Sequence, residues 1–506
     1  MDMEMFGGLT RTSSRIAIAA ALGFGAYALS AAPASAQSYG GNCCADLEER
    51  VAELEATTVQ KGNKKVSLTI SGWVVKSMSW YDSGYLNGFT VGDKDYDLAS
   101  RFALTGSATI APGWSGGYNL TVTVPGSTTG VNSNGFNEFA GVNSRLYGGQ
   151  YGVINTLYSY LYIKSDDWGA INLGHLSPAS DNPAVLADIS GTVIESNAVV
   201  FEGGGLNMRP SGTNGTAGPF NQLLICSSAV APGADCFGAA EQAVRYDSPT
   251  WGGFRFETSY GTAGVVNSIL DSDSSISNSG AGLLPRPADA DSKFWDFAAI
   301  YNEDWGDFRV SAAYAYTWLE ASPLNGAEQD IHQVGGTFMH APTGLGLYAT
   351  GNWEMVGNAN NTNCQGTGAF RNVGCLSNSN PGNALPDTNS WGVKPFWKAG
   401  FSGMGATTFY GEYYEYNDFY GLGNALGFAS VLPNCPTGAC AVTNSKIERW
   451  GLGVVQEIDA AAMHVYARWQ NMGVTELDIQ DLNTLERRTQ GFDDNNLFQL
   501  GGIIFF

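Results

Sequence analysis

Cysteine is the residue type whose spacing points most directly to chemistry in this sequence. Six of the eight cysteines fall in three close pairs, each in a stretch rich in glycine, asparagine, proline and alanine: Cys226 with Cys236, Cys364 with Cys375, and Cys435 with Cys440. Close pairs in loop-like stretches of an exported chain predict three local disulfides. Cys43 and Cys44 are adjacent and cannot easily bridge each other, so we expect free thiols or cross-links to neighbouring chains.

Histidine and serine suggest two other kinds of site, for metal binding and for catalysis. A zinc site would need histidines near a cysteine pair, but the four histidines lie far from every pair in sequence: His175, His332, His340 and His464. The stretch Gly113–Gly117, GWSGG, matches the G-x-S-x-G nucleophile motif, which needs a helix after its serine, and here a second strand is expected. The sequence has neither a P-loop nor a cluster of metal ligands. We therefore predict no enzyme activity, no metal and no cofactor.

The N-terminus and the composition predict export. Two arginines precede an apolar run, Ile16–Ala32, and Ala34 and Ala36 stand where a signal-peptide cleavage site needs small residues, so residues 1–36 are expected to be a signal peptide. No later segment approaches the eighteen or so consecutive apolar residues of a membrane helix. A net charge of −22 and a pI of about 4.4 argue against a nucleic-acid partner. A large secreted β-protein or a membrane β-barrel remains.

A short amphipathic segment follows the predicted signal peptide. In DLEERVAELEATTVQK, residues 46–61, Leu47, Val51 and Leu54 lie at the spacing of a coiled-coil seam. The seam is too short for a stable isolated helix. We therefore expect residues 37–63 to be a periplasmic linker whose short coiled coil associates with copies of itself.

From Lys64 onward, apolar side chains recur at every second position. Examples are the alternate residues from Phe308 to Trp318 and from Met463 to Trp469. The last stretch, NNLFQLGGIIFF, has the same pattern and ends on Phe506. Because a strand projects alternate side chains to opposite faces, each segment is a strand with one apolar face. A final strand of this kind needs no polar tail if it closes a barrel against the first strand and turns its apolar face to lipid.

Short and long connections alternate between these strands. Short turns are expected at 111–117, 166–169, 248–253, 303–306, 341–344, 402–405 and 457–461, and longer loops at about 83–98, 127–152, 176–240, 263–292, 320–327, 357–388, 418–445 and 474–494. Short turns at one end and long loops at the other are typical of bacterial outer-membrane barrels. We therefore predict an all-β fold, a transmembrane antiparallel β-barrel of about 16 strands over residues 64–506, preceded by the short helical coiled-coil segment.

The order of several motifs resembles the alphaproteobacterial general porins of the Porin_2 type. The motifs are VSLTISGWV (66–74), WGAINLGHLSPASD (168–181), VRYDSPTWGGFRFETSYG (244–261) and the terminal Phe506. The resemblance implies a homotrimer in the Gram-negative outer membrane, surrounded by lipid and lipopolysaccharide, with both termini in the periplasm. It also implies a water-filled channel for passive diffusion of small hydrophilic solutes and ions, and recognition of Phe506 by the barrel-assembly machinery.

Charged residues are the predicted functional site. Alternation places six arginines on inward faces: Arg101, Arg245, Arg255, Arg309, Arg449 and Arg468. The resemblance implies that the third loop, about 176–240, folds into the barrel and sets its acids against this basic wall; these acids are Asp181, Asp188, Glu195 and Glu202. Opposed charges would order water and polar solutes in the narrowed gap. Two alternatives stay open, a channel with a preferred substrate and a barrel-anchored structural protein or adhesin.

Overall fold

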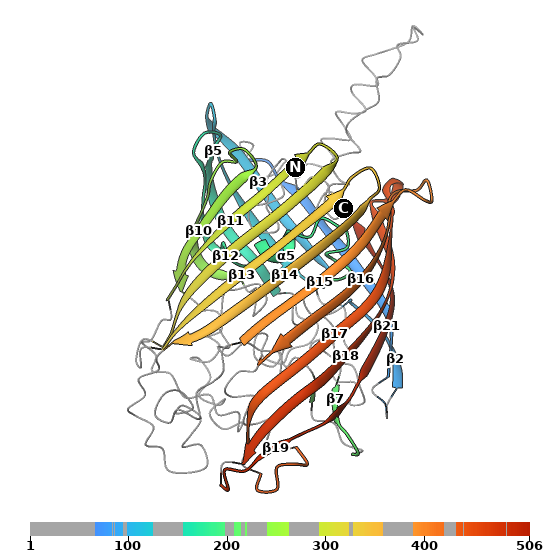
Figure 1. The fold of residues 1–506 in the computed structure, drawn as a ribbon. Helices are drawn as coiled ribbons and strands as arrows, with labels where there is room; N and C mark the ends of the chain where they lie inside the picture. Colours follow the sequence, from blue (N-terminus) through green and yellow to red (C-terminus); the bar gives the residue numbers. More distant parts are fainter. Residues whose placement is uncertain are drawn as a thin grey trace.

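The structure, a computed structural model, describes residues 66–82, 84, 87–94, 99–124, 155–197, 207–213, 218–219, 240–262, 293–322, 327–357, 388–418, 432–438, 440–481 and 483–506. The main sheet has eighteen strands. Two of them, β2 (Asn87–Gly92) and β19 (Arg487–Thr489), are short strands beside β1 and β18. The other sixteen follow one another around a closed antiparallel barrel, as the sequence predicts (Figure 1).

The barrel strands differ in length, and those early in the chain are mostly the shorter ones. They are β1 (Thr69–Asp82), β3 (Arg101–Ala111), β4 (Trp114–Thr123), β5 (Asn155–Ser165), β6 (Gly169–Leu176), β9 (Glu241–Asp247), β10 (Phe254–Thr262), β11 (Lys293–Trp305), β12 (Phe308–Ser322), β13 (Ala327–His340), β14 (Leu345–Gly357), β15 (Thr388–Ala399), β16 (Thr407–Asn417), β17 (Cys440–Ile458), β18 (Met463–Asp481) and β21 (Asn495–Phe505).

The last strand closes the barrel. β21 pairs with β18 on one edge and with β1 on the other, where Trp73 lies opposite Phe505. Its outward side chains, among them Phe498 and Ile504, are exposed, whereas Leu497 and Ile503 on its inward face are buried. Both edges of β21 are therefore hydrogen-bonded, and its exposed face is apolar, as expected for a strand that faces lipid.

All seven predicted turns join neighbouring strands at the end of the barrel where the C-terminus lies (Figure 1). In the GWSGG stretch, Gly113 has a positive φ of 75° in the turn and Ser115 lies in β4, so strands flank the motif on both sides. The predicted loop 320–327 is shorter than expected, because β12 runs to Ser322 and β13 begins at Ala327. Backbone pairing continues there through polar residues that the hydrophobic pattern does not mark as strand.

Helical structure is scarce in the part of the chain that the structure describes. It consists of α5 (Pro183–Leu186) and the single 3-10 turn η4 (Asp459–Ala461). Among these described residues no helix is long and apolar enough to cross a membrane.

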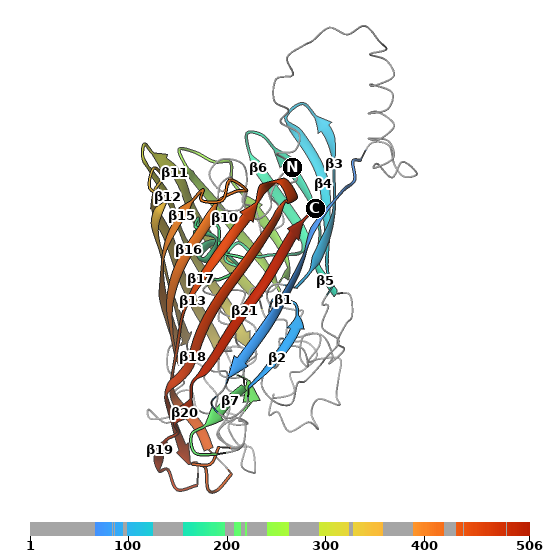
Figure 2. The ribbon, with the colours of Figure 1, turned by 90° about the vertical axis from the view of Figure 1, so that its right-hand side faces the viewer.

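A small second sheet lies at the loop end of the barrel. It joins β7 (Asn207–Pro210) and β8 (Gly218–Pro219), which lie in the later part of the third loop, to β20 (Phe492–Asp493), which precedes the last strand. Figure 2 shows β7 beside β20 below the barrel wall. Two loops far apart in sequence are therefore fixed to each other outside the barrel.

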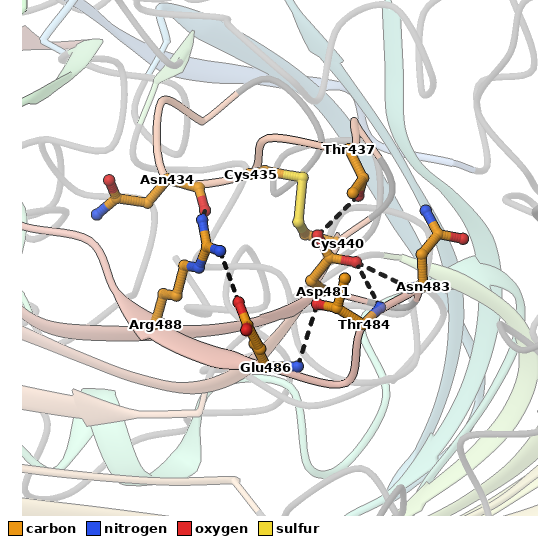
Figure 3. The surroundings of a disulfide bond; sticks show 9 residues. All are labelled: Asn434, Cys435, Thr437, Cys440, Asp481, Asn483, Thr484, Glu486 and Arg488. Carbon is orange, nitrogen blue, oxygen red and sulfur yellow. Dashed lines mark hydrogen bonds and ion pairs between the residues drawn. A yellow bond between two sulfur atoms is a disulfide. The ribbon is translucent and has the colours of Figure 1, made fainter.

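A disulfide between Cys435 and Cys440 closes the loop just before β17, which confirms one of the three predicted pairs (Figure 3). Thr437 Oγ1 in this loop donates a hydrogen bond of 2.8 Å to the carboxylate of Asp481 at the end of β18. This hydrogen bond links the disulfide-closed loop to the hairpin of β17 and β18. The other six cysteines lie outside the described residues: Cys43, Cys44, Cys226, Cys236, Cys364 and Cys375. The predicted coiled-coil seam, Leu47, Val51 and Leu54, also lies outside them.

Candidate functional site

Residues 177–197, which we call the wall segment of loop 3, run along the inner face of the barrel. Figure 1 shows its helix α5 inside the barrel. Nearly all of its residues are buried. The segment begins at β9, where Arg245 Nη1 donates a 2.7 Å hydrogen bond to the Ser177 carbonyl oxygen. On the next two strands, Ala179 N donates to Ser259 Oγ at 2.7 Å, and Ser180 donates to Asp296.

The middle of the wall segment packs closely on β13 and β14. Tyr348 donates a 2.9 Å hydrogen bond to the Ala184 carbonyl oxygen, and Thr337 donates one of 2.7 Å to that of Ala187. A Cβ on Gly335 would collide with the Ala184 backbone, so this position of β13 needs glycine for the loop to approach. The segment therefore lies flat against the wall and does not stand free in the lumen.

Apolar burial drives this packing. Val185, Ile189, Val193 and Ile194 of the wall segment join a buried cluster with inward residues of the wall such as Phe396. Full burial of side chains of this size stabilises by about 1.5–3 kcal/mol each. These contacts explain why a polar barrel interior holds an apolar stretch of loop.

Lys394 on β15 is the centre of the polar contacts. It is fully buried, and its ammonium lies 2.5 Å from Asp188, 3.0 Å from Thr192 Oγ1 and 2.7 Å from the Ser196 carbonyl oxygen. One wall lysine thus binds the loop at three points.

The wall segment ends on β16, β17 and β18. Ser196 donates a hydrogen bond to Glu412, and Arg449 donates one to the Asn197 carbonyl oxygen. Glu195 accepts a hydrogen bond at 2.7 Å from His464, and its carbonyl oxygen accepts one at 2.8 Å from Arg468 Nη1. Including a bond from Thr317 of β12, the segment has a hydrogen bond or ion pair with every strand from β9 to β18.

The predicted acids lie against the wall, not across a gap from it. Asp188 and Glu195 contact Lys394 and His464, neither of which is among the predicted arginines. The physical reason is burial: a carboxylate in a packed segment needs a partner in direct contact. Glu202 lies outside the described residues.

Asp181 is buried near the start of the wall segment and accepts a hydrogen bond from Ser177. Burial raises its pKa to about 7, against the lowering effects of this hydrogen bond and of the nearby guanidinium of Arg245. Its charge therefore titrates close to neutral pH.

The six predicted arginines divide into two groups. Arg245, Arg449 and Arg468 donate hydrogen bonds to the wall segment. The others interact with wall or turn residues: Arg101 lies 4.1 Å from the ring centroid of Trp73, Arg255 pairs with Glu257 at 2.6 Å, and Arg309 pairs with Asp304 at 3.6 Å near a turn. Half of the predicted basic wall thus positions the loop.

Sequence reasoning missed Lys394, His464 and Glu412. A signal for Lys394 was present, because it alternates on β15 with outward aromatic residues, Trp391 and Trp397, and so must point inward. His464 and Glu412 also follow from alternation, but their contact with loop 3 has no sequence signal.

Comparison of this sequence with family models assigns the chain to a protein family. Residues 17–470 match the family model described as Gram-negative porin. No match is found among curated proteins. Similar solved structures include the anion-selective porin from Comamonas acidovorans (14% identity, 87% of this chain and 100% of that chain, TM-score 0.48). A second is OmpT of Vibrio cholerae in its trimer form (11% identity, 88% of this chain and 100% of that chain, TM-score 0.46). A third is OprB of Pseudomonas putida (10% identity, 91% of this chain and 97% of that chain, TM-score 0.49).

Proposed function

We propose that this chain, which belongs to the Gram-negative porin family, is an outer-membrane channel that small hydrophilic solutes and ions cross by passive diffusion. The observation that supports this most is the division of the barrel into an apolar outside and a polar inside. Large apolar side chains are exposed on the outward faces of the strands, whereas inward positions hold buried polar residues such as Thr121, Gln333 and Asn352. A barrel of about sixteen strands is wide enough to leave an aqueous channel.

The wall segment of loop 3 is the part of the site that would set the size limit. It occupies space inside the barrel along its contacts from β9 to β18. A loop held at so many points is a fixed obstruction, so the pore is narrower than its barrel. The charged groups at its contacts, among them Asp188, Lys394 and Glu195, are our proposed constriction residues.

Several finer features belong to the same proposal. The resemblance to alphaproteobacterial general porins supports a homotrimer, contacts with lipopolysaccharide, periplasmic termini and recognition of Phe506 during assembly. Catalysis is not part of the proposal, because the family consists of channels.

Reconstitution of the purified protein into planar bilayers tests the function. We expect stepwise, ohmic current increments, because a fixed loop in a wide barrel leaves a permanent aqueous path. Blockade by one solute would instead indicate a channel with a preferred substrate. Silent membranes containing folded protein would contradict the proposal and favour an anchor for an adhesin.

Assembly gives a second test. The outward face of β1 exposes Ile70, Val74 and Met78, and the predicted seam at residues 47–54 precedes this strand. We expect trimers in mild detergent, and deletion of residues 43–60 should weaken association while the barrel stays folded. Native mass measurements report the oligomer, and heat-dependent gel mobility reports the barrel. Monomers alone for the parent protein would show that the trimer proposal is wrong.

A further inference from the structure

The part of the barrel wall beneath α5 presents small side chains to the wall segment. Three alanines and one glycine occupy buried inward positions of β11, β12 and β13: Ala298, Ala313, Ala315 and Gly335. Towards its other end the segment meets larger inward side chains, among them Lys394 and Phe396. Because little side chain separates them, α5 and the backbone of the wall can approach each other closely.

Alanines of the wall segment lie against these wall alanines on both sides of α5. Before the helix, Ala179 shares a buried cluster with Ala298 and Ala315. After it, Ala187 shares another buried cluster with Ala313. The residues that flank α5 are therefore packed against β11 and β12 through small side chains.

Gly335 lies directly beneath the helix. It stands on the inward face of β13 between Gln333 and Thr337, which donate hydrogen bonds of 3.1 and 2.7 Å to carbonyl oxygens of the wall segment before and after Ala184. A Cβ on Gly335 would lie 2.0 Å from the Ala184 carbonyl oxygen, and a Cβ essentially never comes closer than 3.0 Å to such an atom. Any side chain at position 335 therefore requires a movement of about 1 Å.

The helix, not the strand, would make this movement. β13 is hydrogen-bonded along its length to β12 on one side and to β14 on the other. In contrast, α5 has four residues and is held by separate side-chain hydrogen bonds, such as the one from Tyr348 to the Ala184 carbonyl oxygen. Because a packed interior does not compress easily, volume added at position 335 would move α5 away from the wall and into the lumen.

We propose that Gly335 is a size-determining residue of the pore, because the absence of a side chain there sets how far α5 stands from the wall. Passage of uncharged solutes through a water-filled pore depends on its diameter. Glycine at this position keeps the helix close to the wall and the free cross-section large. This inference rests on the proposed channel function.

The same two strands provide a matched control on the lipid-facing side. Gly335 pairs with Ala313 on the inward face, whereas the next residue, Gly336, pairs with Ala312 on the outward face. The nearest atom to a Cβ on Gly336 would be the Ser311 carbonyl oxygen at 3.2 Å, so a shift of a few tenths of an ångström suffices there. A change at position 336 therefore leaves the lumen as it is.

The test compares Gly335→Ala with Gly336→Ala in planar bilayers and in liposomes that swell in sugars of different size. We expect Gly335→Ala to lower single-channel conductance by about a fifth, because the conductance of a water-filled pore follows its free cross-section. Swelling in a trisaccharide should slow about twofold and swelling in a pentose much less, since the larger solute is nearer the size limit. Gly336→Ala should match the parent in both measurements.

Ala313→Val is a second variant, with Ala312→Val as its control, for the case that Gly335→Ala does not fold. It adds volume beneath the same helix from the neighbouring strand, so conductance should again fall. Parent or higher conductance in folded Gly335→Ala, or in Ala313→Val where that variant is needed, would overturn the inference. Failure of the parent protein to conduct would instead contradict the channel function.

Discussion

Replacing Lys394 by methionine should loosen the part of loop 3 around residues 188–196, raise single-channel conductance and increase current noise. Lys394 is fully buried and contacts the loop at Asp188, Thr192 and Ser196. Methionine has a similar length, so it fills the space but leaves the Asp188 carboxylate buried without a cation. Breaking a buried pair in this way costs about 3–5 kcal/mol. The apolar cluster around Val185 would still bind part of the segment, so the barrel should fold and its constriction should become mobile.

Lys446→Met is the matched control. Lys446 also pairs with two carboxylates, Glu415 at 3.1 Å and Glu448 at 2.9 Å, but its side chain is 32% exposed and the pairs lie away from the wall segment. Exposed ion pairs contribute about 0–1 kcal/mol, so this variant should conduct like the parent. Equal conductance and noise in Lys394→Met and the parent would mean that apolar packing alone fixes the loop.

The barrel could be predicted from the sequence because its physical cause repeats along the chain. Lipid outside and polar groups inside act on every strand, so segments such as Phe308–Trp318 show the alternation directly. The same rule placed Arg449 and Arg468 on inward faces, where the structure has them buried. Two strand pairs extend into predicted loops, β12 with β13 and β17 with β18, since backbone pairing continues where the apolar pattern stops.

The contacts of the loops could not be predicted in this way. Which wall residue meets Asp188 depends on the path of loop 3 across the strands, and that path depends on close approaches such as the one at Gly335. The alternation of side chains along a strand predicts which ones point inward, but it does not predict which loop residue each of them contacts. The division of one edge of β1 between β3 at residues 69–73 and β2 at residues 77–82 likewise has no mark in the sequence.

Neutralising the three acids of the wall segment should shift the channel towards anions. The variant combines Asp181→Asn, Asp188→Asn and Glu195→Gln. Asn and Gln have nearly the same shape as Asp and Glu and still accept hydrogen bonds from Lys394 and the other wall residues, so the segment should keep its place on the apolar cluster, although the Lys394 ammonium loses its counter-charge. Three negative charges beside Lys394, Arg245 and Arg468 then disappear. In a tenfold KCl gradient, where perfect selectivity gives roughly 59 mV, we expect a shift of about 10 mV or more towards the anion limit.

The control carries Asp166→Asn, Asp167→Asn and Asp307→Asn, which remove three acids from exposed turns. Salt screens these charges over a Debye length of about 8 Å, so the reversal potential should change little. Unchanged conductance and reversal potential in the wall-segment variant would mean that these acids do not lie near the path of the ions.

Dependence on pH separates a local charge effect from a general loosening of the loop. Because the pKa of Asp181 is raised to about 7, lowering the pH from 8 to 6 protonates this carboxyl in the parent protein. Protonation removes a negative charge, so the parent itself should move towards anions as the pH falls. The variant has already lost that charge, and the difference between the two proteins should therefore be larger at pH 8 than at pH 6. A loop that has merely become mobile would give a difference that does not follow the titration of Asp181.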